Sequence, residues 1–137
     1  MAANNTVNAG AGNVSLTTTG AGNAITQNAT GVITAGTLAL TTTNANATLN
    51  AATNAITNLG AATLGTGSLN LLDAGGLAVS GAVAATSGIT LNTSGALAIN
   101  NAVNAGAGNV SLTSTGAVTQ TQPITAAGLD HRQSVAE

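Results

Sequence analysis

Residues 5–20 read NTVNAGAGNVSLTTTG, and residues 101–116 repeat this stretch as NAVNAGAGNVSLTSTG. The second copy begins 96 positions after the first and differs from it at two positions, where Ala102 replaces Thr6 and Ser114 replaces Thr18. Internal repetition this close is typical of proteins that stack one structural unit on the next. The sequence therefore predicts a repeat architecture.

A shorter pattern recurs between the two copies: an apolar residue, a polar or small residue and a second apolar residue, followed by small polar residues and Gly or Asn. Alternation with period two is the signature of β-strands, and segments rich in Val, Leu, Ile and Thr between such turns fit short strands. We expect the apolar members of each pair to face the core. The ten predicted core positions are Val14, Leu16, Leu38, Leu40, Leu69, Leu71, Ile89, Leu91, Val110 and Leu112.

The spacing of these pairs predicts a β-solenoid, in which each strand lies over its equivalent one coil below at about 4.8 Å. Two weaker alternating segments follow each pair in the C-terminal half, so we expect three short strands per coil. The steps between pairs predict five to six coils of about 20–21 residues. The step from Leu38 to Leu69 is longer than the others, which predicts one enlarged coil near residues 44–66.

The composition also raises the alternative of a disordered chain, because Gly, Ser, Asn, Thr and Ala dominate it. The mean hydropathy of +0.37 and the charged fraction of only 3% argue against disorder. The absence of aromatic residues is unusual for a globule of this length. A narrow solenoid filled by aliphatic side chains does not need them.

Charge is confined almost entirely to the C-terminal end. Residues 1–129 contain one charged side chain, Asp73, whereas Asp130, His131, Arg132 and Glu137 follow close together at the end of the chain. We therefore predict a single solenoid domain over residues 1–129 and a non-repeat polar tail over residues 130–137. The tail is either a frayed polar end or a polar cap that shields the last strand edge. The N-terminal edge has no such charge, which predicts end-to-end self-association.

The residue inventory argues against catalysis. The chain has no Cys and one His, which excludes thiolate chemistry, Cys-based zinc sites and multi-His metal sites. Asp130, His131 and Ser134 contain the letters of a nucleophilic triad, but they are adjacent in the predicted tail with no groups to orient them. We predict no enzyme, no catalytic residue, no cofactor and no metal. Asp73, in LLDAGG, is predicted to be a corner residue whose carboxylate binds backbone N–H groups.

Threonine is the commonest outward residue of the predicted strands. Stacked coils would align these residues into an ordered array on the surface, for which Thr is also simply a favourable strand residue. The single Arg and the absence of aromatic residues argue against nucleic acid as a partner. The candidate surface array consists of Thr17, Thr19, Thr41, Thr43, Thr90, Thr113 and Thr115.

Three segments carry a resemblance to a known family: GNVSLTTTGAGNAITQ at 12–27, ITAGTLALTT at 33–42, and GALAINNAVNAGAGNVSLTSTGAVTQTQPITAAGL at 95–129. Their recurring G-N-V-x-L-x-x-x-G-x-[VI]-x-Q and I-T-A-x-G-L steps resemble the repeats of filamentous-haemagglutinin-type exoproteins of two-partner secretion systems. The resemblance implies a right-handed parallel β-helix, export in an unfolded state through a partner outer-membrane pore, and a stalk role in adhesion or biofilm.

On this resemblance we expect a structural shaft fragment of a secreted adhesin, at or outside the surface of a Gram-negative bacterium. Its implied partners, through the parent protein, are the outer-membrane secretion pore and a host-cell or biofilm surface component. No binding residue can be carried over from the family. The start at Met1 has no signal-peptide pattern, so we expect an internal piece of a larger protein. The alternative is a Thr-rich β-solenoid that acts as an ice-binding surface or a self-assembling fibre module.

Overall fold

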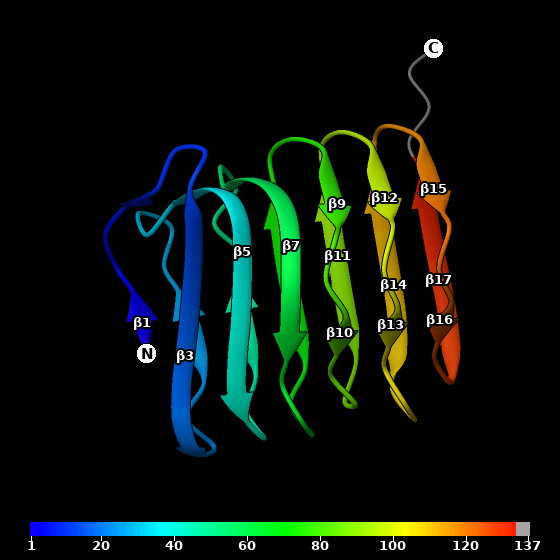
Figure 1. Cartoon of the computed structure of the whole chain (residues 1–137), viewed down its shortest axis with the longest axis horizontal. Coiled ribbons are helices and arrows are strands. Elements are labelled where there is room, and N and C mark those ends of the chain that lie inside the picture. The colour runs from blue at the N-terminus through cyan, green and yellow to red at the C-terminus, as the bar shows by residue number, and fades with distance from the viewer. Residues whose placement is uncertain (134–137) are drawn as a thin grey trace.

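The computed structural model describes residues 1–133 and consists of seventeen parallel strands wound into one β-solenoid (Figure 1). The chain runs down the near side of the solenoid and up the far side while it advances from left to right, so the coil is right-handed (Figure 1). Residues 1–133 contain no helix that is long and apolar enough to cross a membrane. The predicted all-β solenoid is confirmed.

Two sheets form the long sides of the solenoid, and we call them sheet A and sheet B. Sheet A contains β1 (Ala2–Ala3), β4 (Ile25–Gln27), β6 (Ala47–Leu49), β8 (Leu69–Asp73), β11 (Ile89–Thr93), β14 (Asn109–Ser114) and β17 (Gly128–Gln133). Sheet B contains β2 (Val7–Asn8), β3 (Asn13–Ala21), β5 (Ile33–Thr43), β7 (Ala55–Thr63), β9 (Leu77–Val79), β10 (Val83–Ala84), β12 (Leu97–Ile99), β13 (Val103–Asn104), β15 (Val118–Gln120) and β16 (Ile124–Thr125).

The number of strands per coil changes along the axis. From β8 onward each coil has three short strands, as in β8, β9 and β10. In the preceding coils the second and third strands are fused into the single long strands β5 and β7. Strand β7 pairs with both β9 and β10, and Leu59 is registered with Val79 while Ala62 is registered with Val83. The later coil therefore inserts one extra residue between these two points, which opens a bend around Gly81.

The predicted enlarged coil near residues 44–66 is wrong. Ala47 is registered with Ile25 below it and with Leu69 above it, and these two steps along the chain are equal in length. The apparent long step arose because Leu38 lies in β5 of sheet B whereas Leu69 lies in β8 of sheet A. The longer coil is the first one, in which the step from Val7 to its register partner Ile33 exceeds both of those at Ala47.

The two copies of the repeated phrase occupy different sides of the solenoid. The first copy places Val14 in β3 of sheet B, whereas the second places Val110 in β14 of sheet A. Both copies keep the same alternation, with these valines buried. The phrase therefore specifies a strand and its inward face, but not the sheet to which the strand belongs.

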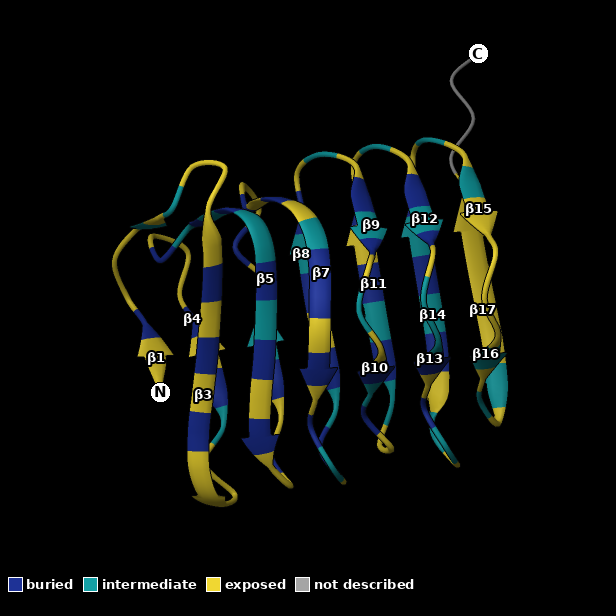
Figure 2. Cartoon of the chain, viewed as in Figure 1, coloured by how far each residue is buried: buried dark blue, intermediate teal, exposed yellow. Residues whose placement is uncertain are grey.

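A continuous apolar core runs along the axis, and buried and exposed residues alternate along the strands (Figure 2). Each inward side chain stacks on its equivalent in the next coil, as Leu91 does on Leu71 and Leu112. All ten predicted core residues are buried, at 9% exposure or less. The two weaker alternating segments also contribute buried residues, such as Leu77, Val79, Leu97 and Ile99. The large core residues that the sequence missed are Leu49, Ile56, Leu59 and Leu64.

Glycine at one bend lets successive coils approach closely. The Gly95 N–H donates to the carbonyl of Gly75 at 3.0 Å, and the Gly116 N–H donates to the carbonyl of Gly95 at 3.1 Å. A Cβ atom on Gly95 would lie 2.7 Å from the nitrogen of Gly76, and one on Gly116 would lie 2.6 Å from the nitrogen of Ala96. Any larger residue would push the coils apart at this bend.

We predict that Leu91→Ala lowers the free energy of unfolding by about 2–5 kcal/mol, because it leaves a cavity in a fully buried layer. Its neighbour Asn92 is exposed, so Asn92→Ala should change the stability by no more than about 0.5 kcal/mol. Urea unfolding followed by circular dichroism measures both. Equal losses in the two variants would contradict the inward position of Leu91.

Candidate functional site

The outer face of sheet A carries a column of polar side chains along the solenoid axis. Register pairs place one such residue on each strand from β4 to β17. The column offers hydroxyl and amide groups, and its charge is limited to the last member. Its members in order are Thr26, Thr48, Asn70, Thr90, Ser111 and Asp130.

The single threonine array that the sequence predicted is wrong, because its members lie on two faces. Thr17 and Thr41 stand in register on sheet B, together with Thr63, which was not among the predicted members. Thr90 and Thr113 lie on sheet A, but in different columns, because Thr90 is registered with Ser111. The remaining three, Thr19, Thr43 and Thr115, lie near or beyond the ends of their strands.

A shallow groove follows the polar column of sheet A. One hollow of about 400 Å³ lies between Asn70, Thr90 and Ser111 on one side and the bend at Gly88 and Gly108 on the other. A second hollow of about 350 Å³ adjoins it at Ser111 and extends to Asp130. The groove can form hydrogen bonds through hydroxyl and amide groups, but it offers no aromatic ring.

A buried polar corner interrupts the apolar core, and we define it by Gln27, Asn54 and Asp73. The side-chain carbonyl of Asn54 accepts hydrogen bonds from Gln27 Nε2 at 2.6 Å and from the Ile33 N–H at 2.9 Å. Its Nδ2 donates to the carbonyl of Leu72 at 3.0 Å. Asn54 therefore connects β4, β5 and β8. Sequence reasoning missed Gln27 and Asn54, because isolated polar letters in an Asn-rich chain carry no visible signal.

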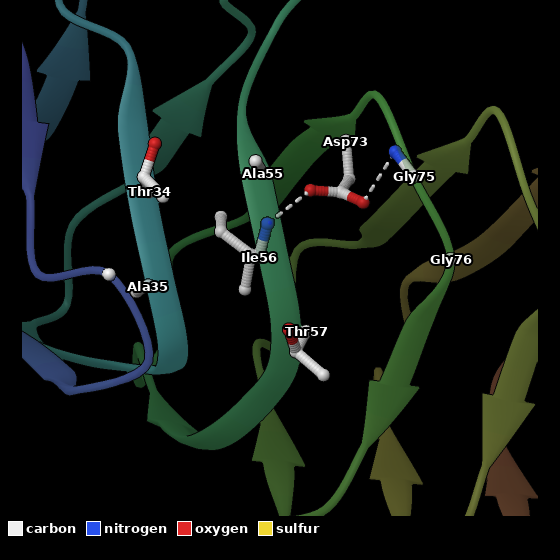
Figure 3. A pocket seen from close by; sticks show the side chains of 9 residues that line it. Thr34, Ala35, Ala55, Ile56, Thr57, Asp73, Gly75 and Gly76 are labelled. Atoms are coloured by element: carbon white, nitrogen blue, oxygen red, sulfur yellow. Dashed lines mark hydrogen bonds between the residues drawn. The ribbon is translucent and has the colours of Figure 1, made fainter.

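Asp73 is the only charged side chain of the polar corner, and it is fully buried. Its Oδ1 accepts from the Ile56 N–H at 2.7 Å, and its Oδ2 accepts from the Gly75 N–H at 3.0 Å (Figure 3). The predicted role of Asp73 as a corner residue that binds backbone N–H groups is confirmed. Burial raises the pKa of Asp73 above its ordinary value of 3.8, and the two backbone hydrogen bonds oppose this shift.

The next two coils replace Asp73 with hydroxyl residues. Thr93 and Ser114 are in register with it, and each donates its hydroxyl to a backbone carbonyl two residues later.

A hollow of about 350 Å³ lies beside Asp73, lined by Thr34, Ala35 and Thr57 among others (Figure 3). Both carboxylate oxygens of Asp73 already accept hydrogen bonds from backbone N–H groups. Within residues 1–133, no group of three or more His, Cys, Asp or Glu side chains could hold a metal ion.

The last described strand changes the predicted domain boundary. Strand β17 continues past Leu129 to Gln133 and pairs with β14 over six residues, so Asp130, His131 and Arg132 belong to the last rung of the solenoid. The sequence missed this because β17 places His131 at the position held by Leu112 one coil below. Asp130 forms an ion pair with Arg132 at 3.2 Å. Ser134 and the rest of the predicted tail lie outside the described residues.

Comparisons of this chain with protein-family models, with curated proteins and with solved structures find no match.

The raised pKa of Asp73 predicts a specific pH dependence of stability. A carboxyl group whose pKa is raised by folding binds its proton more tightly in the folded state than in the unfolded state. Its contribution to the free energy of unfolding is therefore full below about pH 3.8 and is lost as the pH rises through the folded pKa. Thermal melts between pH 3 and pH 7 should show this loss in the wild type. They should not show it in Asp73→Thr, which copies Thr93. The surface variant Asp130→Asn is the control and should keep it.

The division of the threonines between two faces predicts that the protein produces no measurable thermal hysteresis. An ice-binding face requires ordered groups in adjacent columns, and on sheet A the column beside Thr90 contains Leu72 and Asn92. Nanolitre osmometry on the purified chain tests this prediction. A clear freezing-point gap that Thr90→Leu removes would restore the ice-binding hypothesis.

Proposed function

We propose that this chain is a segment of the shaft of a secreted bacterial surface adhesin of the filamentous-haemagglutinin type, with no catalysis of its own. The observation that carries this proposal is that the solenoid is open at its described ends. Among residues 1–133, β3 has β5 as its only strand partner, and β17 has only β14. A further coil could add to either edge with the same ladder and the same core.

The exposed end of the core supports this interpretation. Val118 and Ile124 are only partly buried against the last coil, and Leu129 is 55% exposed. In the interior coils the equivalent side chains are buried, as is Leu97, which is in register with Val118. In a longer solenoid the next coil would cover these side chains, with the same strand pairing as in the coils before it.

The distribution of contacts also suits a shaft. Each interior strand is hydrogen-bonded to the equivalent strands of the coils before and after it, so a coil can be added without rearranging the core of the coils already present. The outer faces carry small, neutral side chains, and residues 1–129 have one charged side chain, Asp73. A chain with so little charge meets a small electrostatic barrier in a pore, and each coil can then fold on the one already outside.

The proposed location is the surface of a Gram-negative bacterium or the surrounding medium. The outer-membrane pore of the parent protein would export the chain, and the parent would contact a host-cell or biofilm component. In this role the segment supplies distance and stiffness. The second function that the open ends favour is self-association.

Export gives a direct test of the proposal. The chain is fused behind the secretion domain of a two-partner system and co-expressed with the matching pore in a Gram-negative host. We expect the wild-type segment to reach the medium, and Leu91→Asp to reduce export severalfold because a charge in the core prevents the coil from forming.

Asn92→Asp is the matched control, since it adds the same charge at the adjacent position on the exposed face. It should be exported like the wild type. Failure of the wild-type segment to leave the cell, or equal export of Leu91→Asp, would overturn the proposal.

A further inference from the structure

The two open ends of the solenoid differ in their chemistry. At the N-terminal end, β3 spans nine residues, and its exposed side chains are all uncharged. At the C-terminal end, β17 presents Asp130 and Arg132 on its outer face, beside the exposed side chain of Leu129. An apolar end surrounded by a free strand edge is a surface that another strand can cover.

The order of charges in β17 is self-complementary. Asp130 and Arg132 are separated by one residue and lie on either side of His131. If two copies of β17 run antiparallel with His131 opposite its counterpart, each Asp130 faces an Arg132 of the other copy. Opposite charges directly across an antiparallel pair are favourable, and like charges are not.

No neighbouring register gives this result. A shift by one residue places inward side chains of one copy opposite outward side chains of the other, which the pleat does not allow. A shift by two residues places Asp130 opposite Asp130, or Arg132 opposite Arg132. The register centred on His131 is therefore the one that the sequence of β17 specifies.

The rest of the last coil fits the same two-fold arrangement. Strands β15 and β16 lie in sheet B on the two sides of the level of β17's midpoint (Figure 1). A two-fold axis through His131 exchanges these two levels, so β15 of one copy meets β16 of the other. The half-buried Val118 and Ile124 would then be covered, together with Leu129.

We propose that this chain forms a symmetric dimer through its C-terminal rung, with β17 paired antiparallel to β17 of a second copy around His131. The interface is isologous, so it closes at two copies, whereas head-to-tail stacking would produce open fibres. The Asp130–Arg132 ion pair at 3.2 Å within each copy is exchanged for a pair between copies, so the dimer has two pairs in place of the two that the separate copies had. The inference rests on the open rung that also supports the shaft proposal, but it does not depend on adhesin function.

Charge reversal tests the proposed pairing. The wild-type chain of 12.8 kDa should sediment with twice that mass in concentrated solution. Asp130→Arg and Arg132→Asp should each be monomeric, because each places like charges opposite one another. An equimolar mixture of the two variants should form a heterodimer, because every Arg then faces an Asp. The recovery in the mixture also shows that both variants are folded.

Cross-linking tests the register. The chain has no cysteine, and opposite Cα atoms of an antiparallel pair lie about 4.5–5.5 Å apart, within disulfide range. His131→Cys should therefore yield a covalent dimer on mild oxidation, in proportion to the dimer seen by sedimentation. Thr17→Cys, on the N-terminal edge strand β3, is the matched control and should remain a single chain.

Several outcomes would overturn the dimer. These are a wild type that stays monomeric at every concentration, assemblies that grow beyond two copies, a mixture of charge variants that stays monomeric, or cross-linking through Thr17→Cys in place of His131→Cys. None of them bears on export of the segment, which is measured on a fused chain with a different readout.

Discussion

Each coil stacks on the next through a parallel backbone ladder, and this ladder limits every other feature of the molecule. It sets the distance between coils at about 4.8 Å, and that distance decides what each position can hold. Inward positions hold aliphatic side chains in continuous rows, such as Leu71, Leu91 and Leu112. At the bend near Gly95 the backbones come so close that a Cβ atom does not fit. Because contacts run from one coil to its neighbours, the solenoid has no centre and no intrinsic length.

The polar corner shows that the solenoid can bury polar side chains when all of them are hydrogen-bonded. Gln27, Asn54 and Asp73 are buried, yet among residues 1–133 no buried side-chain nitrogen or oxygen lacks a hydrogen-bond partner. An unsatisfied polar atom there would cost about 1–3 kcal/mol. The corner is acceptable because its amide and carboxyl groups bind backbone groups of β5, β6, β7 and β8. The later coils fill the same place with Thr93 and Ser114, whose shorter side chains donate hydrogen bonds to backbone carbonyls of the bend that follows them.

The ends of the stack connect the fold with both proposals. A solenoid cannot satisfy the outer edges of its first and last coils by itself, so these edges are available for another coil or another copy. A continuing shaft covers them with more of the same chain. A symmetric dimer covers the last rung with its own counterpart. Where no further coil covers β17, Asp130 and Arg132 are ordered so that the strand can pair with a second copy of itself in antiparallel register.

Local alternation and repeat length were enough to predict the strands, their inward residues and the size of a coil, and the setting of Asp73 in LLDAGG identified it as a corner residue. The side of the solenoid on which each strand lies was visible only in the folded molecule. Alternation distinguishes inward from outward but carries no information about the sheet, so Val14 and Val110 have the same sequence context and lie in different sheets. The same ambiguity produced the false enlarged coil and the false threonine array. Pairing with β14 also set the end of the last strand, since the letters of β17 show no apolar alternation beyond Leu129.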